Sequence, residues 1–254
     1  MIFPKDVRLL CYDCYIHGKV VLLMSEYISD TTGIYSLFKQ YGSIVKLEKD
    51  RPVFQEGERS EEIYFIVSGS VGINKDTESG KLLTLRVVGP NDYIGETAVF
   101  CDIVYHSFSA ITLESTQLLS LHRTKLENFL MESTELMVEW TKFIQLVYIK
   151  NQTRFRDLML HGKKGALFST LIRLSNTYGQ VQPDGSIIIE YTLTNQKLAN
   201  LCAMSREVVN RMLNDIKNAG IVSFQKGIIT IHDIEFLKRE NECENCPLTI
   251  CRID

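Results

Sequence analysis

Residues 193–216 read LTNQKLANLCAMSREVVNRMLNDI, and this stretch decides the architecture of the C-terminal part of the chain. Apolar residues recur in it at helical spacing on both sides of a short break, so two short helices can pack against each other. Ser205 stands directly before the second segment and is a typical N-cap, because its hydroxyl accepts a hydrogen bond from a free amide of the first turn. The apolar set comprises Leu198, Leu201, Val208, Val209, Met212 and Leu213.

The stretch that follows, IVSFQKGIITIHD at residues 221–233, predicts a β-hairpin. Two runs rich in β-branched residues flank Lys226-Gly227, a pair suited to a tight turn. Two short helices followed by a two-stranded wing form the winged helix–turn–helix pattern. This pattern is typical of proteins that read double-stranded DNA.

The start of the second helix carries side chains suited to base edges. With Ser205 as cap, Arg206, Glu207, Asn210 and Arg211 lie near its N-terminal end, where a recognition helix meets the major groove. Arginine can donate two hydrogen bonds to guanine, and glutamate accepts from cytosine N4. The alternative is a solvated helix face on which Glu207 and Arg211 form an i,i+4 ion pair. The cap and the wing together favour DNA.

The chain before this domain contains a β-rich segment followed by a long helical segment. From about residue 44 to 121, short runs of β-branched and aromatic residues alternate with turn signals, which predicts a small antiparallel barrel or roll. A long helical pattern follows, and long helices often mediate dimers. We expect an α+β protein with an N-terminal β-roll, a long dimerisation helix and a C-terminal winged helix–turn–helix domain. The expected segments are an extension (1–33), the roll (34–125), the dimerisation helix (126–162), the DNA-binding domain (163–239) and a cysteine-rich tail (240–254).

Composition and charge are those of an ordinary globular protein with one basic segment. The 254 residues are 45% hydrophobic and 23% charged, with a net charge of −3. Residues 163–239 hold ten Lys or Arg against six Asp or Glu, a net +4, which leaves −7 for the rest and favours a local polyanion contact. No apolar run approaches the roughly 20 residues of a membrane span, and the start lacks a secretory pattern. We therefore expect a cytoplasmic protein without a membrane partner.

The N-terminal residues show no clean periodicity. Met24 stands just before SEYISDTTGIYSLFKQYG, where we expect the first domain to begin, so one hypothesis is that Met24 is the physiological initiator and that residues 1–23 are not translated. Mass spectrometry of protein made from the native gene tests this.

Three of the seven cysteines lie in the tail. Cys243, Cys246 and Cys251 form a C-x2-C-x4-C pattern in ECENCPLTICRID. In a cytosolic protein such thiols stay reduced, and thiolates bind zinc, copper(I) or iron–sulfur clusters. A zinc ribbon normally supplies two C-x2-C pairs, but spacing alone does not separate zinc from a cluster, and adventitious cysteines are a further alternative. The candidates for a fourth ligand within the chain include Cys11, Cys14, Cys101, Cys202, His161 and His232, of which Cys202 fits a core position better.

Several motifs in sequence order resemble the Crp/Fnr superfamily over about residues 34–254. They are IYFIVSGSVGI and GPNDYIGE in the roll, the long helix, and TNQKLANLC followed by SREVVNR. More narrowly, RDLMLHGKKGALFSTLIRLSNTYG and the CENCPLTIC tail are similar to the Bacillus-type Fnr branch of oxygen-responsive transcription regulators. One departure is Ala203, where the turn in the family often has glycine.

The resemblance implies a ligand set and a target. In the Bacillus-type branch, three tail cysteines and an aspartate bind a [4Fe–4S] cluster, and the matching aspartate is Asp157. Without the resemblance, Asp157 would be interpreted as a helix-surface carboxylate paired with Arg154 or Arg156. Arg206 matches regulators that read TGTGA half-sites, so we expect a TGTGA-like palindrome, a homodimer, and RNA polymerase as a partner. The DNA-binding set expected from the cap, the helix and the resemblance is Thr194, Ser205, Arg206, Glu207, Asn210 and Arg211.

A cyclic nucleotide is not expected in the roll. In the Crp branch a glutamate binds the ribose, and an Arg-Ser pair about ten residues later binds the cyclic phosphate. Gly95-Glu96 keeps the first part, but His106-Ser107 replaces the second. Histidine is a poor substitute for a bidentate guanidinium. We interpret Glu96 as structural.

The leading interpretation is an anaerobic transcription regulator, with activation as the expected mode, that senses oxygen through the cluster. A cluster held by Asp157 and the tail would pin the C-terminus to the hinge before the DNA-binding domain. The alternative is a Crp-like regulator with a structural zinc in the tail or a small-molecule effector. An iron–sulfur electron carrier is disfavoured because it needs neither wing nor recognition helix. No nucleophile–base constellation, P-loop or HExxH motif indicates an enzyme.

Overall fold

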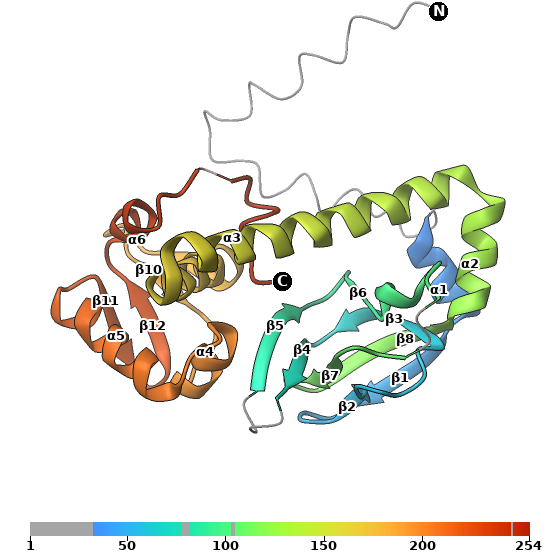
Figure 1. The fold of residues 1–254 in the computed structure, drawn as a ribbon, viewed down its shortest axis with the longest axis horizontal. Coiled ribbons are helices and arrows are strands. Elements are labelled where there is room, and N and C mark those ends of the chain that lie inside the picture. Colours follow the sequence, from blue (N-terminus) through green and yellow to red (C-terminus); the bar gives the residue numbers. More distant parts are fainter. Residues whose placement is uncertain (1–32, 78–81, 103–104, 245) are drawn as a thin grey trace, which may run out of the picture.

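The computed structural model describes residues 33–77, 82–102, 105–244 and 246–254. Cys11, Cys14 and Met24 lie outside this range, so the hypotheses about them stay open. A β-roll and a smaller C-terminal domain lie side by side beneath one long helix (Figure 1). The expected α+β architecture is confirmed. None of the helices among the described residues is both long and apolar enough to cross a membrane.

The roll consists of two four-stranded antiparallel sheets, in the orders β1-β8-β3-β6 and β2-β7-β4-β5. Their inner faces bury an aliphatic core that includes Ile66, Val71 and Leu118. Helix α1 (Ile34–Tyr41) and the short helix η3 (Glu96–Ala98) flank the sheets. The strands are β1 (Ser43–Leu47), β2 (Pro52–Phe54), β3 (Glu62–Ser68), β4 (Val71–Asp76), β5 (Leu82–Val88), β6 (Tyr93–Ile94), β7 (Ser109–Thr112) and β8 (Thr116–His122).

Two helices occupy the region expected to hold one dimerisation helix over 126–162. Helix α2 (Arg123–Glu132) ends before Ser133, whose backbone is extended. The Ser133 hydroxyl accepts a hydrogen bond from the Leu136 amide at 3.3 Å, so it caps the start of α3 (Thr134–Tyr178). A good N-cap residue thus restarts the helix within a continuous helical pattern.

Helix α3 carries a sharp kink at Gly162. Its backbone there has φ 56° and ψ −144°, a conformation that only glycine adopts readily. Before the kink, α3 runs along the roll, where Trp140 packs into the roll core. After the kink, its side chains enter the C-terminal domain, where Leu167 and Leu171 are fully buried. One helix therefore belongs to both domains.

The C-terminal domain is a winged helix–turn–helix with a four-stranded sheet in the order β11-β12-β10-β9. The hairpin expected at Lys226-Gly227 is present, and both residues have positive φ (51° and 81°), as a tight hairpin turn of this kind requires. Strand β9 and helix α6 were not expected from the sequence. The elements are β9 (Gly179–Val181), β10 (Ile187–Ile189), α4 (Asn195–Leu201), α5 (Arg206–Asn218), β11 (Val222–Gln225), β12 (Ile228–Ile231) and α6 (Ile234–Glu240).

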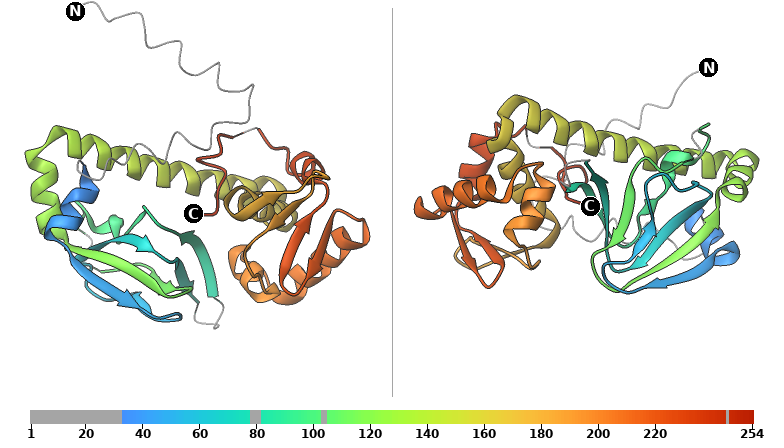
Figure 2. Two further views of the ribbon diagram at one scale, coloured as in Figure 1. Left: turned by 180° about the vertical axis from the view of Figure 1, so that it is seen from behind. Right: turned by 60° about the horizontal axis from the view of Figure 1, so that its bottom comes forward.

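The tail after α6 turns back over α3 and reaches the space between the two domains (Figures 1 and 2). Ile253 is only 3% exposed and belongs to the same buried core as Leu167 and Val209. Cys243 and Cys251 pack against that core. The tail is therefore an integral part of the C-terminal domain.

Candidate DNA interface and metal centre

Hydrogen bonds at their N-termini fix both helices of the helix–turn–helix. The Thr194 hydroxyl accepts from the Lys197 amide at 3.1 Å and caps α4. The Ser205 hydroxyl accepts from the Val208 amide at 3.4 Å and caps α5, as its position in the sequence predicts. Between the helices, Ala203 has a positive φ of 53°, a backbone conformation that favours glycine and so accounts for the glycine that is common at this turn.

The predicted base-reading residues all lie exposed on the first turns of α5. They are Arg206, Glu207, Asn210 and Arg211. Hydrogen bonds from its own backbone amide and from Ser205 lower the pKa of Glu207, so this carboxylate stays ionised and accepts hydrogen bonds. Asn195 on α4 donates from Nδ2 to Asn210 Oδ1 at 2.9 Å. This hydrogen bond uses the carbonyl oxygen of Asn210 and does not involve its two amide N–H donors. The arrangement can present two guanidinium groups, a carboxylate and an amide to a groove.

Asp157 is buried, with 3% of its surface exposed, at the end of the first half of α3. Its Oδ2 atom accepts from Ser169 Oγ at 2.5 Å and from Arg173 Nη2 at 3.2 Å. Its Oδ1 atom accepts from Arg156, with Nη2 at 2.9 Å and Nε at 3.2 Å. The expected pairing with Arg156 is present, but the expected surface position is wrong, because the kink at Gly162 folds the second half of α3 over this carboxylate.

Side chains from both halves of α3 hold the tail through its backbone carbonyls. Arg173 Nη1 donates to Ile250 O at 2.9 Å, and Asn176 Nδ2 donates to Cys251 O at 2.7 Å. Arg154 donates to the carbonyls of Arg252 and Ile253, and Lys150 donates to Asp254 O at 2.6 Å. The tail is thus fixed to the helix that also carries Asp157.

The tail thiols lie close enough to Asp157 and to one another for their charges to interact. Burial raises the pKa of Cys243, the Asn241 side chain opposes this, and the charges of Asp157 and Cys246 add to it. Burial also raises the pKa of Cys251, Arg173 lowers it, and the charges of Cys243, Cys246 and Asp157 raise it.

The donors fit a cluster by their chemistry, because thiolates and a carboxylate are ligand types that bind iron, and the tail that carries the three thiols is fixed to the helix that carries Asp157. In the described part of the chain, however, no three His, Cys, Asp or Glu side chains converge tightly enough to hold a metal ion.

The other candidates for a fourth ligand lie in different surroundings. Cys202 is buried in the core with its Sγ 3.4 Å from Thr170 Oγ1, and burial raises its pKa to about 12. Cys101 lies in a loop of the roll, and His232 contacts Ser223 in the wing at 2.8 Å. His161 stands one residue before the kink. Asp157, unlike these four described residues, is among the charges that raise the pKa of Cys243 and Cys251.

Sequence analysis did not identify Ser169 and Arg173, which bind Asp157, or helix α6, which leads into the tail. These residues meet Asp157 only because α3 changes direction at Gly162. The sequence pattern did not predict which side chains this kink brings together. Arg156 was considered only as a surface partner of Asp157. The sequence signal available was an arginine next to the aspartate.

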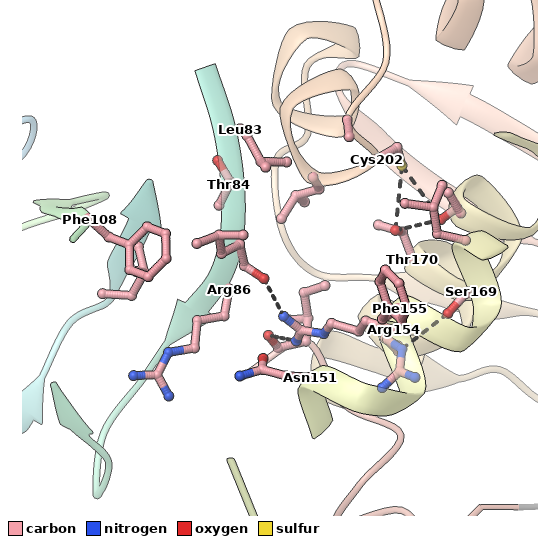
Figure 3. Close-up of a pocket in the computed structure, with 18 of the residues that line it drawn as sticks. Leu83, Thr84, Arg86, Phe108, Asn151, Arg154, Phe155, Ser169, Thr170 and Cys202 are labelled. Atoms are coloured by element: carbon pink, nitrogen blue, oxygen red, sulfur yellow. Dashed lines mark hydrogen bonds between the residues drawn. The ribbon is translucent and has the colours of Figure 1, made fainter. Parts of the chain in front are cut away.

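A cavity of about 520 Å³ lies between the roll and the C-terminal domain. Figure 3 shows Arg86 on its roll side and Arg154 reaching across from α3, and Arg154 donates to Leu85 O at 2.7 Å. Glu96 pairs with Arg86 Nη2 at 2.6 Å, so this carboxylate has a structural partner. His106 stacks on Phe54 at a centroid distance of 3.7 Å, and burial lowers the pKa of His106.

Comparison with known proteins places both domains among characterised families. Residues 44–133 match the cyclic nucleotide-binding domain, and residues 166–240 match the Crp-like helix-turn-helix domain. The anaerobic regulatory protein of Bacillus subtilis is 44% identical over 88% of this chain and 94% of its own length. A CRP-like cAMP-activated global transcriptional regulator of Mycobacterium tuberculosis is 27% identical over 83% of this chain and 92% of its own.

Solved structures share the fold at low identity. A CRP-family transcriptional regulator from Thermus thermophilus superimposes with a TM-score of 0.65 at 20% identity, over 78% of this chain and 96% of its own. The c-di-GMP-responsive global regulator of Xanthomonas campestris superimposes with a TM-score of 0.69 at 19% identity, over 78% and 98%.

Proposed function

The chain belongs to the Crp/Fnr family of transcription regulators, and on that premise we propose that it is an anaerobic regulator that senses oxygen through a [4Fe–4S] cluster. It binds a TGTGA-like palindromic operator as a homodimer. The observation that carries this proposal is that the partners of Asp157 also bind the cysteine tail: Arg173 donates to Asp157 Oδ2 and to Ile250 O, and Arg156 donates to Asp157 Oδ1 and to Glu244. The name of the B. subtilis relative, an anaerobic regulatory protein, supports it.

The three tail cysteines and Asp157 would hold the cluster, which supplies a metal–sulfur unit that oxygen attacks. A carboxylate is a harder ligand than a thiolate, so the Asp157 corner is the weaker one. Asp157 lies directly before the kink, and the tail lies over the domain beyond it. A cluster held by both Asp157 and the tail cysteines would fix the DNA-binding domain relative to the first half of α3, and so the direction in which α5 projects. Loss of the cluster removes that constraint.

Apolar side chains exposed along α3 support a homodimer. Tyr148 is 56% exposed, Phe155 65% and Met159 65%, and Val138 and Ile149 extend the same helix with further exposed apolar surface. Within the described part of the chain nothing covers these side chains, and exposed apolar surface of this kind is typical of a site that binds a partner. A second copy supplies one and also brings a second recognition helix, as a palindrome requires. RNA polymerase is the expected further partner, and DNA as the target places the protein in the cytoplasm.

The first experiment is an absorption spectrum with iron and sulfide analysis of protein purified anaerobically. About four irons and four sulfides per chain, with a visible band that bleaches in air, is the expected result. Cys246→Ser should abolish the band, whereas Cys101→Ser, in the roll, should retain it. A colourless protein with about one zinc per chain would overturn oxygen sensing but leave DNA binding intact.

Operator binding is measured on the same samples. The cluster-containing dimer should bind a TGTGA palindrome, and exposure to air should weaken that binding in parallel with the bleaching. Unchanged affinity after complete bleaching would contradict the proposed coupling.

A further inference from the structure

The two oxygens of Asp157 lie in different surroundings. Oδ2 is held by Ser169 and Arg173, and the Arg173 and Asp157 side chains are each only 4% exposed. Oδ1 is held by Arg156, whose side chain is 30% exposed. The inner oxygen is therefore fixed by the domain core, and the outer oxygen by a residue with access to solvent.

Arg156 also binds the loop that carries the tail cysteines. Its Nη1 atom donates to Glu244 Oε2 at 2.6 Å, and Glu244 follows Cys243 directly in the sequence. Burial works against the charged guanidinium, but hydrogen bonds to Asp157 and Cys246 and the charges of Asp157 and Glu244 outweigh it and raise the pKa of Arg156. One side chain thus binds both the predicted carboxylate ligand and Glu244, which directly follows Cys243.

The contacts of Arg156 are those that an iron atom would take over. The guanidinium donates to Oδ1 from both Nη2 and Nε, and its Nη1 atom binds Glu244 in the cysteine loop. Arg173 and Ser169 leave Oδ1 alone and hold the other oxygen in place. A carboxylate fixed at one oxygen is prepared to bind a metal through the other, as outer partners of metal ligands commonly arrange.

We propose that Arg156 competes with iron for Asp157 Oδ1, while Ser169 and Arg173 position the carboxylate through Oδ2. The inference rests on the proposed function and assigns the regulation of the same site. With a cluster present, Asp157 Oδ1 would serve as its oxygen ligand, and the hydrogen bonds from Arg156 to that oxygen would be released. When iron leaves, Arg156 takes back Oδ1 and retains the cysteine loop beside α3. No electron or proton is needed for this exchange.

The test compares Arg156→Gln with Arg156→Lys and with Lys164→Gln as the matched control. Lys164 pairs with Glu240 in the same domain, so its substitution also removes one ion pair but touches neither Asp157 nor the loop. In metal-free full-length protein, the rate of Cys246 alkylation by iodoacetamide should rise several-fold in Arg156→Gln relative to Lys164→Gln. Cys101 serves as an internal reference within each sample.

The second measurement is the half-life of the cluster absorption in air after anaerobic reconstitution. Arg156→Gln should lengthen it several-fold because no guanidinium competes for Oδ1, and Arg156→Lys, which keeps the charge but not the paired donors, should fall between. An unchanged or shorter half-life in a brown Arg156→Gln protein overturns the competition alone. A wild-type protein that forms no cluster overturns the proposed function and this inference with it.

Discussion

The Ser169 hydroxyl donates to Asp157 Oδ2 over 2.5 Å, although the two residues lie on opposite sides of the kink at Gly162. Arg173 reaches the same oxygen from one turn further along α3. The carboxylate therefore ties the half of α3 that follows the roll to the half that supports the DNA-binding helices. Any change at Asp157 acts on this joint as well as on the tail.

Replacing Asp157 by alanine should destabilise the metal-free protein by about 3–5 kcal/mol, because the Arg173 guanidinium stays buried without its counter-charge. The double variant Asp157→Ala/Arg173→Leu should be less destabilised than the sum of its single variants. Urea unfolding of all four proteins measures both effects. A loss below about 1 kcal/mol in the single variant would show that the pair does not stabilise the joint. The same variants show whether lost DNA binding reflects the joint or the cluster.

Gly162→Ala should cost about 1–3 kcal/mol, since the backbone at this position lies in a region that side chains disfavour. The space around it is open, so steric contact adds nothing. Gly89 is a matched control, because its surroundings are equally open and its backbone is not strained. Thermal unfolding should give a lower melting temperature for Gly162→Ala than for Gly89→Ala. Equal melting temperatures would show that the backbone at Gly162 is not strained.

Ala203→Gly should stabilise the protein by about 0.5–1 kcal/mol. A left-handed backbone costs alanine about 1–2 kcal/mol, and the greater flexibility of glycine in the unfolded state offsets part of the relief. Ala219 lies at the end of α5 with φ −78°, where no such relief exists. If both Ala203→Gly and Ala219→Gly raised the free energy of unfolding, the αL backbone of Ala203 would not be the cause. Chemical denaturation measures the difference.

Arg206→Ala should weaken operator binding by about 1–3 kcal/mol and relax discrimination at one base pair of each half-site. Lys217→Ala, in the last turn of α5, removes the same charge away from the predicted reading face and should leave discrimination intact. Fluorescence anisotropy at constant salt, with operators substituted one base pair at a time, distinguishes the two. A uniform loss across all operators in Arg206→Ala would assign it to the phosphates instead.

Stability should fall as the pH drops below about 6.5, and His106 should contribute to this fall. Burial against Phe54 lowers the pKa of His106 in the folded protein, so the unfolded chain binds the proton first and acidification favours unfolding. Glu58 opposes the shift by its charge. Above the ordinary pKa both states are neutral and the contribution is constant. His106→Phe should flatten the curve of urea midpoint against pH in this window, and an equally steep curve would exclude His106 as a source.

Local chemistry made the reading motif predictable from the sequence. The cap at Ser205, the apolar set of the two helices and the turn at Lys226-Gly227 each depend on residues that are neighbours in the chain. Periodicity and turn preferences describe such relationships well. The alternation of strands in the roll was readable for the same reason.

The surroundings of Asp157 were not predictable in that way. Its partners Ser169 and Arg173 follow a kink that depends on one glycine, and Arg156 is its neighbour in a helix where adjacent side chains ordinarily diverge. The resemblance to a family pointed to Asp157 as a ligand, but it carried no information on the hydrogen bonds that hold it. These contacts come from tertiary packing, which a linear pattern does not encode.

The burial of Ile253 in the core of the DNA-binding domain has a thermodynamic consequence. A sensor built as a separate module would have to communicate with its reader across a boundary between two cooperative folding units. Here the cysteine tail and the recognition helix share a single hydrophobic core, so they unfold as one unit. A substitution that displaces the tail should therefore also change the free energy that holds α5 in place.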